Sequence, residues 1–392
     1  MRKIPVKVKG FAPRTIVRVA SLKSLITYYH ADLQFLVQVN TESELFQLKE
    51  LIFMGCSNVS LLTASLCLFE RWTEPAVFSS DVFFEDDVVA LTEGVQSAHV
   101  LYRENDKHHT VFLTNRCNSN CLMCSQPPTK QDDSWLVDEA YQVAKHINSS
   151  PKTIGFSGGE PLLLRGKLRE VLNFFIEQHP KSNFELLTNG RLLADHVLAS
   201  SLLLGLTDKV TWMVPLYGHA DFLHDYIVQS HGAFEETIAA LLNLHKYKQA
   251  IQLRTVLIHP VLNFLPEFCE YIGKNFPFIR ELSFMACEPI GFALANRELT
   301  NVDLWSWKET LEKSVKILEA YNINVVFMNT PLCVLPEELR KYAHKSISDW
   351  KRKFEPECSG CTLKKECSGL FNWYAKDKEL MKINAVQGVT YG

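Results

Sequence analysis

Three of the eleven cysteines of the chain lie close together, at Cys117, Cys121 and Cys124. Chance produces this C-x3-C-x2-C spacing in roughly one chain in a hundred of such cysteine content. Three thiolates are one ligand short of a tetrahedral zinc site and of a cubane held by four cysteines. They suit a [4Fe–4S] cluster with three protein-bound irons and a fourth iron that is open to a ligand. The alternatives are a zinc site completed by His108 or His109, or a set of buried structural thiols.

A second group of cysteines lies later in the chain. Cys358, Cys361 and Cys367 have the spacing C-x2-C-x5-C in a polar stretch, and Cys333 lies 25 positions upstream of the first of them. Together they supply four thiolates, which is enough to hold one cubane or one zinc ion. We expect a second [4Fe–4S] cluster here, with a zinc ion or free thiols as the alternatives.

Two glycines and a carboxylate follow directly after a predicted strand. The segment 156–161 has the sequence FSGGEP, which contains Gly158, Gly159 and Glu160. Glycines at a strand end allow a ligand to approach the backbone closely. Exposed carbonyl oxygens and a carboxylate at this place suit an ammonium group. A simple turn is the alternative, because Gly-Gly-Glu-Pro is also a common turn sequence.

Short apolar runs that alternate with helical patterns must position these residues. The runs that predict strands are 110–114, 153–156, 184–187, 210–216, 251–258, 281–285 and 323–327. The segments with apolar residues at helical spacing are 137–147, 168–177, 234–245 and 304–321. This alternation indicates βαβ units and a parallel sheet, in which functional sites lie at the carboxyl ends of the strands. About six units fit, so we predict an α/β fold with a partial (β/α)6 barrel and not a full eight-unit barrel.

The first part of the chain has a different pattern. Short β-like runs occur at Val82–Phe84, Val88–Leu91 and Ala98–Tyr102, and Glu42–Leu51 has the pattern of a helix. We therefore expect a small α+β module. The predicted domains are an N-terminal module for partner or peptide recognition at 1–106, the barrel at 107–330 and a C-terminal cysteine-rich auxiliary domain at 331–392.

The composition excludes several classes of protein. The chain of 392 residues has 41 basic and 44 acidic residues and no basic block, so nucleic acid is not an expected partner. Its most apolar stretch, 197–206, is far shorter than the about 18 residues of a membrane span. The N-terminal segment lacks the apolar core of a signal peptide. We expect a cytoplasmic protein without membrane contact, in which reduced cysteines are available as metal ligands.

The three-cysteine loop resembles the signature of the radical S-adenosylmethionine (SAM) superfamily and stands at the expected place after the first strand of the sheet. The resemblance implies that the amine and carboxylate of SAM chelate the open iron. An electron from the reduced cluster then cleaves the sulfonium, and the resulting 5′-deoxyadenosyl radical abstracts hydrogen from the substrate. The residue before the last cysteine is often aromatic in that family and packs near the adenine. Here it is Met123, which also makes good contacts with π systems.

The same resemblance implies the rest of a SAM site. Gly158, Gly159 and Glu160 match the GGEP motif that holds the methionine amine. Asn189, in a Thr-Asn-Gly segment, would lie near the ribose, with a helix N-cap as the alternative. Arg254 on the fifth strand would meet the SAM carboxylate, with a surface salt bridge as the alternative.

The fourth and sixth strands add further expectations. Relatives often carry a serine on the fourth strand that helps to hold SAM, and Pro215 cannot supply that hydroxyl. Met285 and Glu288 at the end of the sixth strand would face adenine or substrate, with a core methionine as the alternative for Met285. The stretch 224–234 resembles the H-D…G-x-F stretch of peptide-modifying relatives, and we interpret it as a structural landmark.

A closer resemblance rests on longer runs. The runs 100–103, 109–117, 124–128 (CSQPP) and 367–371 are similar to the C-type radical SAM maturase of His-Xaa-Ser peptide systems. This resemblance implies a precursor peptide or small precursor protein as substrate, a second radical SAM maturase as partner and an external electron donor. It also implies an auxiliary cluster at the C-terminal cysteines. The resemblance does not extend to residues 1–80, which are expected to recognise a leader peptide or the partner enzyme. It indicates no catalytic acid or base.

Three other functions remain open. A radical SAM enzyme could act on a small metabolite. A non-catalytic partner could carry clusters and pass electrons, although the three-cysteine loop together with GGEP argues against it. A binding module stabilised by zinc would contain zinc in place of iron.

Overall fold

A computed structural model describes residues 2–206, 208–376 and 378–388. The chain divides into two compact units, each of which is described by itself. The first contains residues 1–113, 134–155 and 170–182, and the second contains residues 114–133, 156–169 and 183–392. The three-domain division based on the cysteine groups remains a prediction.

The first unit contains an eight-stranded sheet in the order β1-β8-β7-β3-β4-β5-β6-β2. Its strands are β1 (Arg2–Pro5), β2 (Lys7–Lys9), β3 (Thr15–Ala20), β4 (Phe35–Gln38), β5 (Val59–Thr63), β6 (Ala76–Phe78), β7 (Val88–Leu91) and β8 (Ser97–Tyr102). Strands β3 to β6 run parallel and alternate with α1 (Leu22–Tyr28), α2 (Glu42–Phe53) and α3 (Leu66–Arg71). The other pairs are antiparallel.

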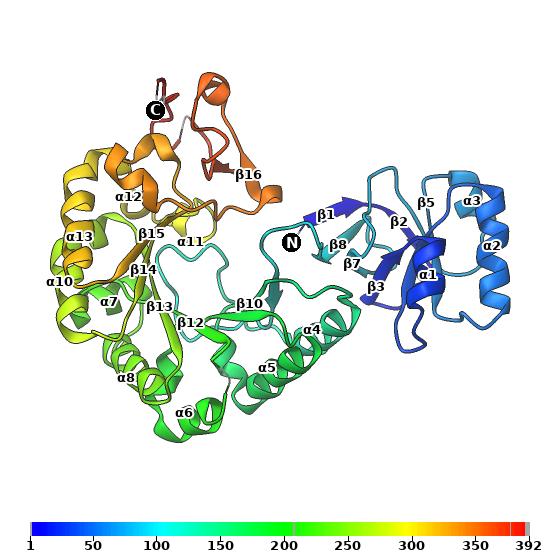
Figure 1. Ribbon diagram of the computed structural model, residues 1–392, viewed down its shortest axis with the longest axis horizontal. Coiled ribbons are helices and arrows are strands. Elements are labelled where there is room, and N and C mark those ends of the chain that lie inside the picture. The colour runs from blue at the N-terminus through cyan, green and yellow to red at the C-terminus, as the bar shows by residue number, and fades with distance from the viewer. Residues whose placement is uncertain (1, 207, 377, 389–392) are drawn as a thin grey trace. The chain divides into compact units, whose positions relative to one another are not determined.

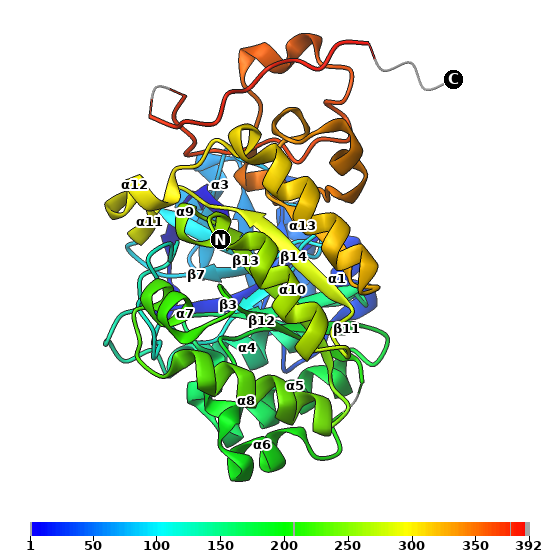
Figure 2. The same cartoon turned by 90° about the vertical axis from the view of Figure 1, so that its left-hand side faces the viewer.

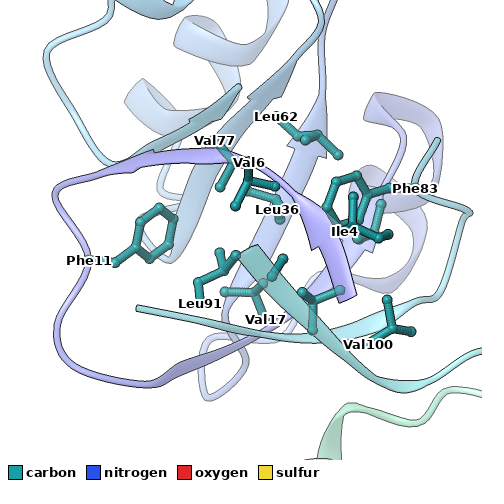
Figure 3. Close-up of a cluster of buried hydrophobic side chains, with 13 residues drawn as sticks. Ile4, Val6, Phe11, Val17, Leu36, Leu62, Val77, Phe83, Leu91 and Val100 are labelled. Carbon is teal, nitrogen blue, oxygen red and sulfur yellow. The ribbon is translucent and has the colours of Figure 1, made fainter. Parts of the chain in front are cut away.

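The two strands at the ends of this sheet are nearly continuous in the chain. Only Val6 separates β1 from β2, so the segment 2–9 serves both ends of the sheet. A cluster of buried side chains, including Val17, Leu36 and Val77, lies on one face of the strands (Figure 3). A second buried cluster joins the strands to α1, α2 and α3, which Figure 1 shows beside them in blue. The module therefore has apolar cores on both faces of its sheet.

Most of the predicted elements of this module are present. The predicted helix at 42–51 is α2, and the runs 88–91 and 98–102 are β7 and β8. The expectation of a strand at Val82–Phe84 is wrong. Phe83 instead packs into the buried cluster, and the Phe84 N–H donates to the Asp87 carboxylate, which holds the segment in a turn.

A seven-stranded sheet carries the central part of the chain, in the order β9-β10-β11-β12-β13-β14-β15. Its strands are β9 (Thr110–Phe112), β10 (Thr153–Ser157), β11 (Asn183–Leu187), β12 (Val210–Pro215), β13 (Ala250–Leu257), β14 (Glu281–Ala286) and β15 (Asn324–Met328). From β11 to β15 each strand runs parallel to the next in the chain. The prediction of an α/β fold with a parallel sheet is confirmed, and this strand order agrees with a partial barrel.

Helices follow the strands as predicted. They are α4 (Trp135–His146), α5 (Gly166–Gln178), α6 (His196–Leu203), α7 (Asp221–Val228), α8 (Ala233–Lys246), α9 (His259–Leu262), α10 (Leu265–Asn275), α11 (Phe292–Ala295), α12 (Arg297–Thr300) and α13 (Lys308–Ala320). Figure 2 shows α10 and α13 side by side along β13 and β14. Their close approach requires Gly273, because a Cβ there would lie 2.2 Å from the ring of Tyr321. The predicted helix at 304–321 begins with the 3-10 turn η3 (Leu304–Trp307).

Among the described residues after β15, the elements are all short. They are η4 (Leu332–Val334), η5 (Glu337–Tyr342), η6 (Asp349–Lys351), β16 (Arg352–Lys353), η7 (Pro356–Gly360) and β17 (Leu370–Phe371), with β16 and β17 paired antiparallel. Figure 1 shows this orange-to-red segment beside α12, and Arg297 and Asn301 donate hydrogen bonds to the carbonyl of Lys378 at 2.9 and 2.8 Å. Within the described part of the chain, every helix is too short or too polar to cross a bilayer.

Candidate functional site

The three-cysteine loop starts directly after β9, and the buried carboxylate of Asp133 connects its two ends. Asp133 is 3% exposed and accepts hydrogen bonds from the Thr114 hydroxyl (2.8 Å) and the Asn115 N–H. The guanidinium of Arg116 pairs with the same carboxylate at 3.4 Å. Asp133 therefore joins the first residues of the loop to the last.

The middle of the loop is held through its backbone. The N–H groups of Asn120 and Leu122 donate to the carbonyls of Val228 (3.1 Å) and Ile227 (2.9 Å), at the end of α7. A helix end leaves carbonyl groups without partners inside the helix, and the loop uses them. The position of the loop thus depends on α7.

A glycine brings a second segment against the last cysteine. The N–H of Phe292 donates to the carbonyl of Cys124 at 2.8 Å. The preceding Gly291 has a φ of +62°, and a Cβ there would lie 2.5 Å from that same carbonyl oxygen. Only glycine fits this position without displacing the loop.

The three thiols of the loop are half-buried and affect one another electrostatically. The pKa is raised to about 11 for Cys117 and to about 12 for Cys121, with burial as the largest cause and the charges of neighbouring cysteines among the others. Burial also raises the pKa of Cys124. Without a metal these thiols are neutral, whereas iron would stabilise the thiolates and offset their repulsion. The donor set therefore fits an iron–sulfur cluster.

A site for a single metal ion needs its ligands to converge on one position. Among the residues that the structure describes, no three His, Cys, Asp or Glu side chains converge on one ion position. A cubane spreads its cysteines over separate irons and does not need this convergence. His109, which was a possible fourth zinc ligand, packs its ring against Tyr102 with the ring centroids 4.6 Å apart.

Gly158 and Gly159 lie against the cysteine loop itself. The N–H of Gly159 donates to the carbonyl of Thr114 at 2.7 Å, and the N–H of Glu160 donates to the carbonyl of Arg116 at 2.8 Å. A Cβ on Gly159 would lie 2.2 Å from the Arg116 oxygen, and one on Gly158 would lie 2.5 Å from the Thr114 oxygen. The two glycines thus allow the backbone of the cysteine loop to approach closely. From the sequence, this close approach was expected for a ligand.

Glu160 is fully buried, and its carboxylate forms hydrogen bonds with other groups of the protein. Its carboxylate accepts hydrogen bonds from the Leu162 N–H (2.8 Å), the Thr188 hydroxyl (2.6 Å) and the Asn189 N–H (2.6 Å). Burial raises its pKa to about 6, and these hydrogen bonds oppose the rise. Glu160 therefore connects the GGEP segment to the end of β11.

Asn189 reaches the cysteine loop from that strand end. Its amide donates to the Asn118 side-chain oxygen at 2.6 Å and lies 4.0 Å from the Cys117 sulfur. Two residues further, Arg191 donates to the Asn118 carbonyl (2.7 Å) and the Ser119 hydroxyl (3.0 Å). The ends of β10 and β11 and the cysteine loop thus form one hydrogen-bonded unit.

Arg254 has unusual partners. Its guanidinium faces the sulfur atoms of Met213 (3.3 Å), Met285 (3.2 Å) and Met328 (3.7 Å). Thioethers are weak acceptors, and no carboxylate in the described part of the chain lies within ion-pair distance of it. Burial lowers the pKa of Arg254, and the charge of Glu185 opposes this. The alternative interpretation of Arg254, a surface salt bridge, is therefore not seen among these residues.

Other predicted residues have clear positions. Met123 is buried at 6% exposure, and Glu288 pairs with the Lys351 ammonium at 3.4 Å. Asp225 accepts hydrogen bonds from the N–H groups of Gly232 (2.6 Å) and Phe234 (2.8 Å). This arrangement fits the interpretation of the 224–234 stretch as a structural landmark.

The four C-terminal cysteines line a single cavity, together with Phe354 and Lys364. The N–H groups of Leu332 and Gly369 both point at the Cys367 sulfur at 3.4 Å. Burial raises the pKa of Cys333 to about 11, and the N–H of Asn384 opposes this rise. Hydrogen bonds to sulfur are common around iron–sulfur clusters, so this donor set also fits a cluster.

Sequence reasoning missed Asp133 and Arg191. Asp133 carries no local signal, because its partners are 17 to 19 residues away in the chain. Arg191 directly follows Thr188-Asn189-Gly190, which could have drawn attention to it.

Comparison with known families gives a match for the central part of the chain. Residues 111–264 match the family described as "Radical SAM superfamily". The match includes the three-cysteine loop, the GGEP segment, Asn189 and Arg254. This part of the chain is a radical SAM superfamily domain.

Two curated proteins and several solved structures are similar to the chain. A probable GTP 3′,8-cyclase of Methanocella arvoryzae is 32% identical over 130 residues, which are 33% of this chain and 40% of that protein. An uncharacterized protein of Methanocaldococcus jannaschii is 25% identical over 170 residues, which are 42% of this chain and 58% of that protein. The chain thus spans about half the length of these relatives.

The solved structures are more distant. Streptococcus suis SuiB bound to S-adenosylmethionine has a TM-score of 0.44 and 13% identity, covering 73% of this chain and 60% of that one. A radical SAM methyltransferase from Sphaerobacter thermophilus has a TM-score of 0.41 and 17% identity, covering 62% of this chain and 72% of that one. Similarity at this level supports no conclusion about substrate.

Proposed function

We propose that the protein is a radical SAM enzyme that reductively cleaves SAM and abstracts hydrogen from a precursor peptide of a His-Xaa-Ser system. The observation that carries the radical SAM part is the backbone connection between the three-cysteine loop and the GGEP segment, inside the matched domain. The peptide part rests on the resemblance of the runs 109–117 and 124–128.

Each predicted residue has a role in this proposal. Cys117, Cys121 and Cys124 would hold three irons of a [4Fe–4S] cluster. When bound, the cluster supplies an electron and SAM supplies the 5′-deoxyadenosyl radical. The protein contributes the loop that carries these three half-buried thiols.

The SAM contacts come from the neighbouring strand ends. The carbonyl groups of Gly158 and Gly159 are proposed to accept from the methionine amine, and Glu160 holds Asn189 in place. Met123 would pack near the adenine and Asn189 near the ribose. Arg254 would bind the carboxylate of SAM, because its present acceptors are only thioethers.

A second [4Fe–4S] cluster is proposed for Cys333, Cys358, Cys361 and Cys367. Its support is the common cavity that the four thiols line. With four ligands it would relay electrons from an external donor or stabilise the C-terminal segment. The N-terminal module is proposed to bind the leader of the precursor peptide or a second radical SAM maturase.

Anaerobic reconstitution followed by iron counting and a SAM cleavage assay tests the function. With dithionite, we expect the wild-type protein to form 5′-deoxyadenosine. Replacing Cys124 with Ala should lower the rate at least about a hundredfold, because the cluster loses one of its three ligands. The matched control is Cys67→Ala, in which an exposed cysteine of α3 is removed. It should cleave SAM at the wild-type rate.

The alternatives predict other results. A fully loaded cluster without formation of 5′-deoxyadenosine would indicate an electron-transfer partner. Zinc with little iron would indicate a binding module. A peptide with His-Xaa-Ser repeats should crosslink to the protein and increase SAM cleavage. If SAM is cleaved but such a peptide neither crosslinks nor changes the rate, a small metabolite becomes the better substrate class.

A further inference from the structure

A cavity separate from that of the C-terminal cysteines lies at the carboxyl ends of three neighbouring strands. Leu257 ends β13, Ala286 ends β14 and Asn329 directly follows β15, and all three line it. The C-terminal segment supplies further lining residues, which are Leu370, Phe371, Tyr374, Glu379 and Met381. In open parallel sheets, ligands bind at the carboxyl ends of the strands. The cavity therefore lies where this fold places its functional sites.

The short helix α11 connects this cavity to the three-cysteine loop. Its residue Leu294 lines the cavity. The N–H of Phe292, at the start of α11, donates to the carbonyl of Cys124 at 2.8 Å. The side-chain amide of Asn296, directly after α11, donates to the carbonyl of Leu122 at 2.9 Å. The cavity and the cysteine loop are thus held together by the same helix.

The cavity also borders on the C-terminal cysteines. Pro331 and Leu370 line both this cavity and the one that the four C-terminal cysteines line. A group held here would therefore be adjacent to both places for which iron–sulfur clusters are proposed.

The polar side chains of the lining already have partners in the protein. The guanidinium of Arg297, for example, pairs with the Glu379 carboxylate at 3.1 Å. The other polar lining side chains with such hydrogen bonds are Thr300, Asn301, Asn329 and Tyr374. None of the buried side-chain atoms that lack a hydrogen-bond partner in the described part of the chain belongs to the lining. A polar group that entered the cavity would lose its water and find no free side-chain partner.

The rest of the lining is apolar. Leu257, Ala286 and Val302 are at most 6% exposed. Burial raises the pKa of the Cys287 thiol to about 12, so this lining thiol is neutral and behaves as a small apolar group. Empty apolar cavities stay dry and bind apolar ligands. The volume is about 40 Å³, well below the roughly 150 Å³ of a cavity that holds benzene, which favours a small aliphatic group over an aromatic ring.

We propose that this cavity binds a small aliphatic side chain of the substrate peptide and thereby selects which part of the peptide is held beside the three-cysteine loop. This inference rests on the proposed function, and it concerns the substrate and not SAM. In a His-Xaa-Ser repeat the imidazole and the hydroxyl are polar, so only the residue at the Xaa position can fill the cavity. Valine at that position should bind better than threonine, which has the same shape but replaces a methyl group with a hydroxyl.

Anaerobic fluorescence anisotropy with the reconstituted full chain tests this, in the presence of SAM and without reductant so that SAM stays intact. The probes are two labelled peptides, one with His-Val-Ser repeats and one with His-Thr-Ser repeats. We expect the wild-type protein to bind the valine peptide at least about tenfold more tightly, because a hydroxyl buried without a partner costs about this much affinity.

Leu294→Asp places a charge in the lining, at a side chain that is 45% exposed and can reach solvent, so the fold is retained. We expect its Kd for the valine peptide to rise about tenfold and the two peptides to bind within about threefold of each other. The matched control is Leu242→Asp, which changes a 50% exposed leucine of α8 outside the cavity and should alter neither Kd. Iron content and thermal midpoint should be equal in the two variants.

Two results would overturn the inference alone. One is equal binding of both peptides by a wild-type protein that also forms 5′-deoxyadenosine. The other is a preference for valine that persists in Leu294→Asp, because the preference would then arise elsewhere. Failure of the proposed function looks different. If the wild-type protein with a full cluster binds neither peptide, the peptide part of the proposed function is wrong and the inference falls with it. If it forms no 5′-deoxyadenosine, the enzyme part is wrong.

Discussion

At the scale of single residues, the absence of a side chain at Gly159 is what allows the cysteine loop to close. The atoms that a Cβ would meet are the carbonyl oxygen and carbon of Arg116, at 2.2 and 2.7 Å. Both belong to the backbone, so no flexible side chain can move aside. The loop would have to shift, and with it the hydrogen bonds of Gly159 and Glu160 to Thr114 and Arg116.

Gly159→Ala should therefore destabilise the protein by about 2 kcal/mol or more, since forcing extra atoms into a packed region costs this much. It should also lower the iron bound to the loop. The measurements are urea unfolding and iron per chain. Gly166→Ala is the matched control, because it lies at the start of α5 with no atom within 4 Å of a built Cβ. It should be neutral or slightly stabilising. Equal behaviour of the two variants would contradict this account.

At the scale of elements, the connection between β12 and α7 depends on a neutral histidine. His224 is 2% exposed, and burial lowers its pKa to about 4. Its Nδ1 accepts the Tyr217 N–H, so this nitrogen carries no proton in the folded protein. Protonation would remove the acceptor and place a charge inside the packed helix–strand contact.

This linkage predicts a pH dependence. A histidine whose pKa is depressed in the folded state contributes stability above its unfolded pKa of about 6.5 and loses it as the pH falls toward 4. Between pH 7.5 and pH 5 the wild type should lose about 2 kcal/mol of unfolding free energy relative to His224→Gln, which cannot titrate. Urea unfolding of both proteins at the two pH values measures this. A constant difference between them would show that His224 titrates normally.

At the scale of the whole molecule, the chain carries two separate groups of cysteines. Cys117, Cys121 and Cys124 lie on the loop after β9, and the other group lines a cavity in the segment after β15. If each group holds one cubane, Cys361→Ala should lower the iron per chain by about half and leave the loop cluster in place. Iron analysis and electron paramagnetic resonance check this. An unchanged iron count would remove the second cluster from the proposal.

Much of the central fold was predictable because its signals are local. Apolar runs followed by helical spacing predicted β9 to β15 and the helices α4, α5, α8 and α13. The prediction failed at Val82–Phe84, where apolar residues serve the core from a turn. A buried side chain in an irregular segment has the same local pattern as a short strand, so only the surrounding structure distinguishes them.

The sequence alone determined the types and spacing of the cysteines and the position of GGEP one βα unit later. These features depend on residues that are close together in the chain. Only the tertiary structure showed that Asp133 fastens the loop, that Glu160 serves Asn189, and that Cys333 joins the later cysteines. These contacts join residues that are distant in the chain, and their distances depend on how strands align and helices pack, which no local pattern encodes.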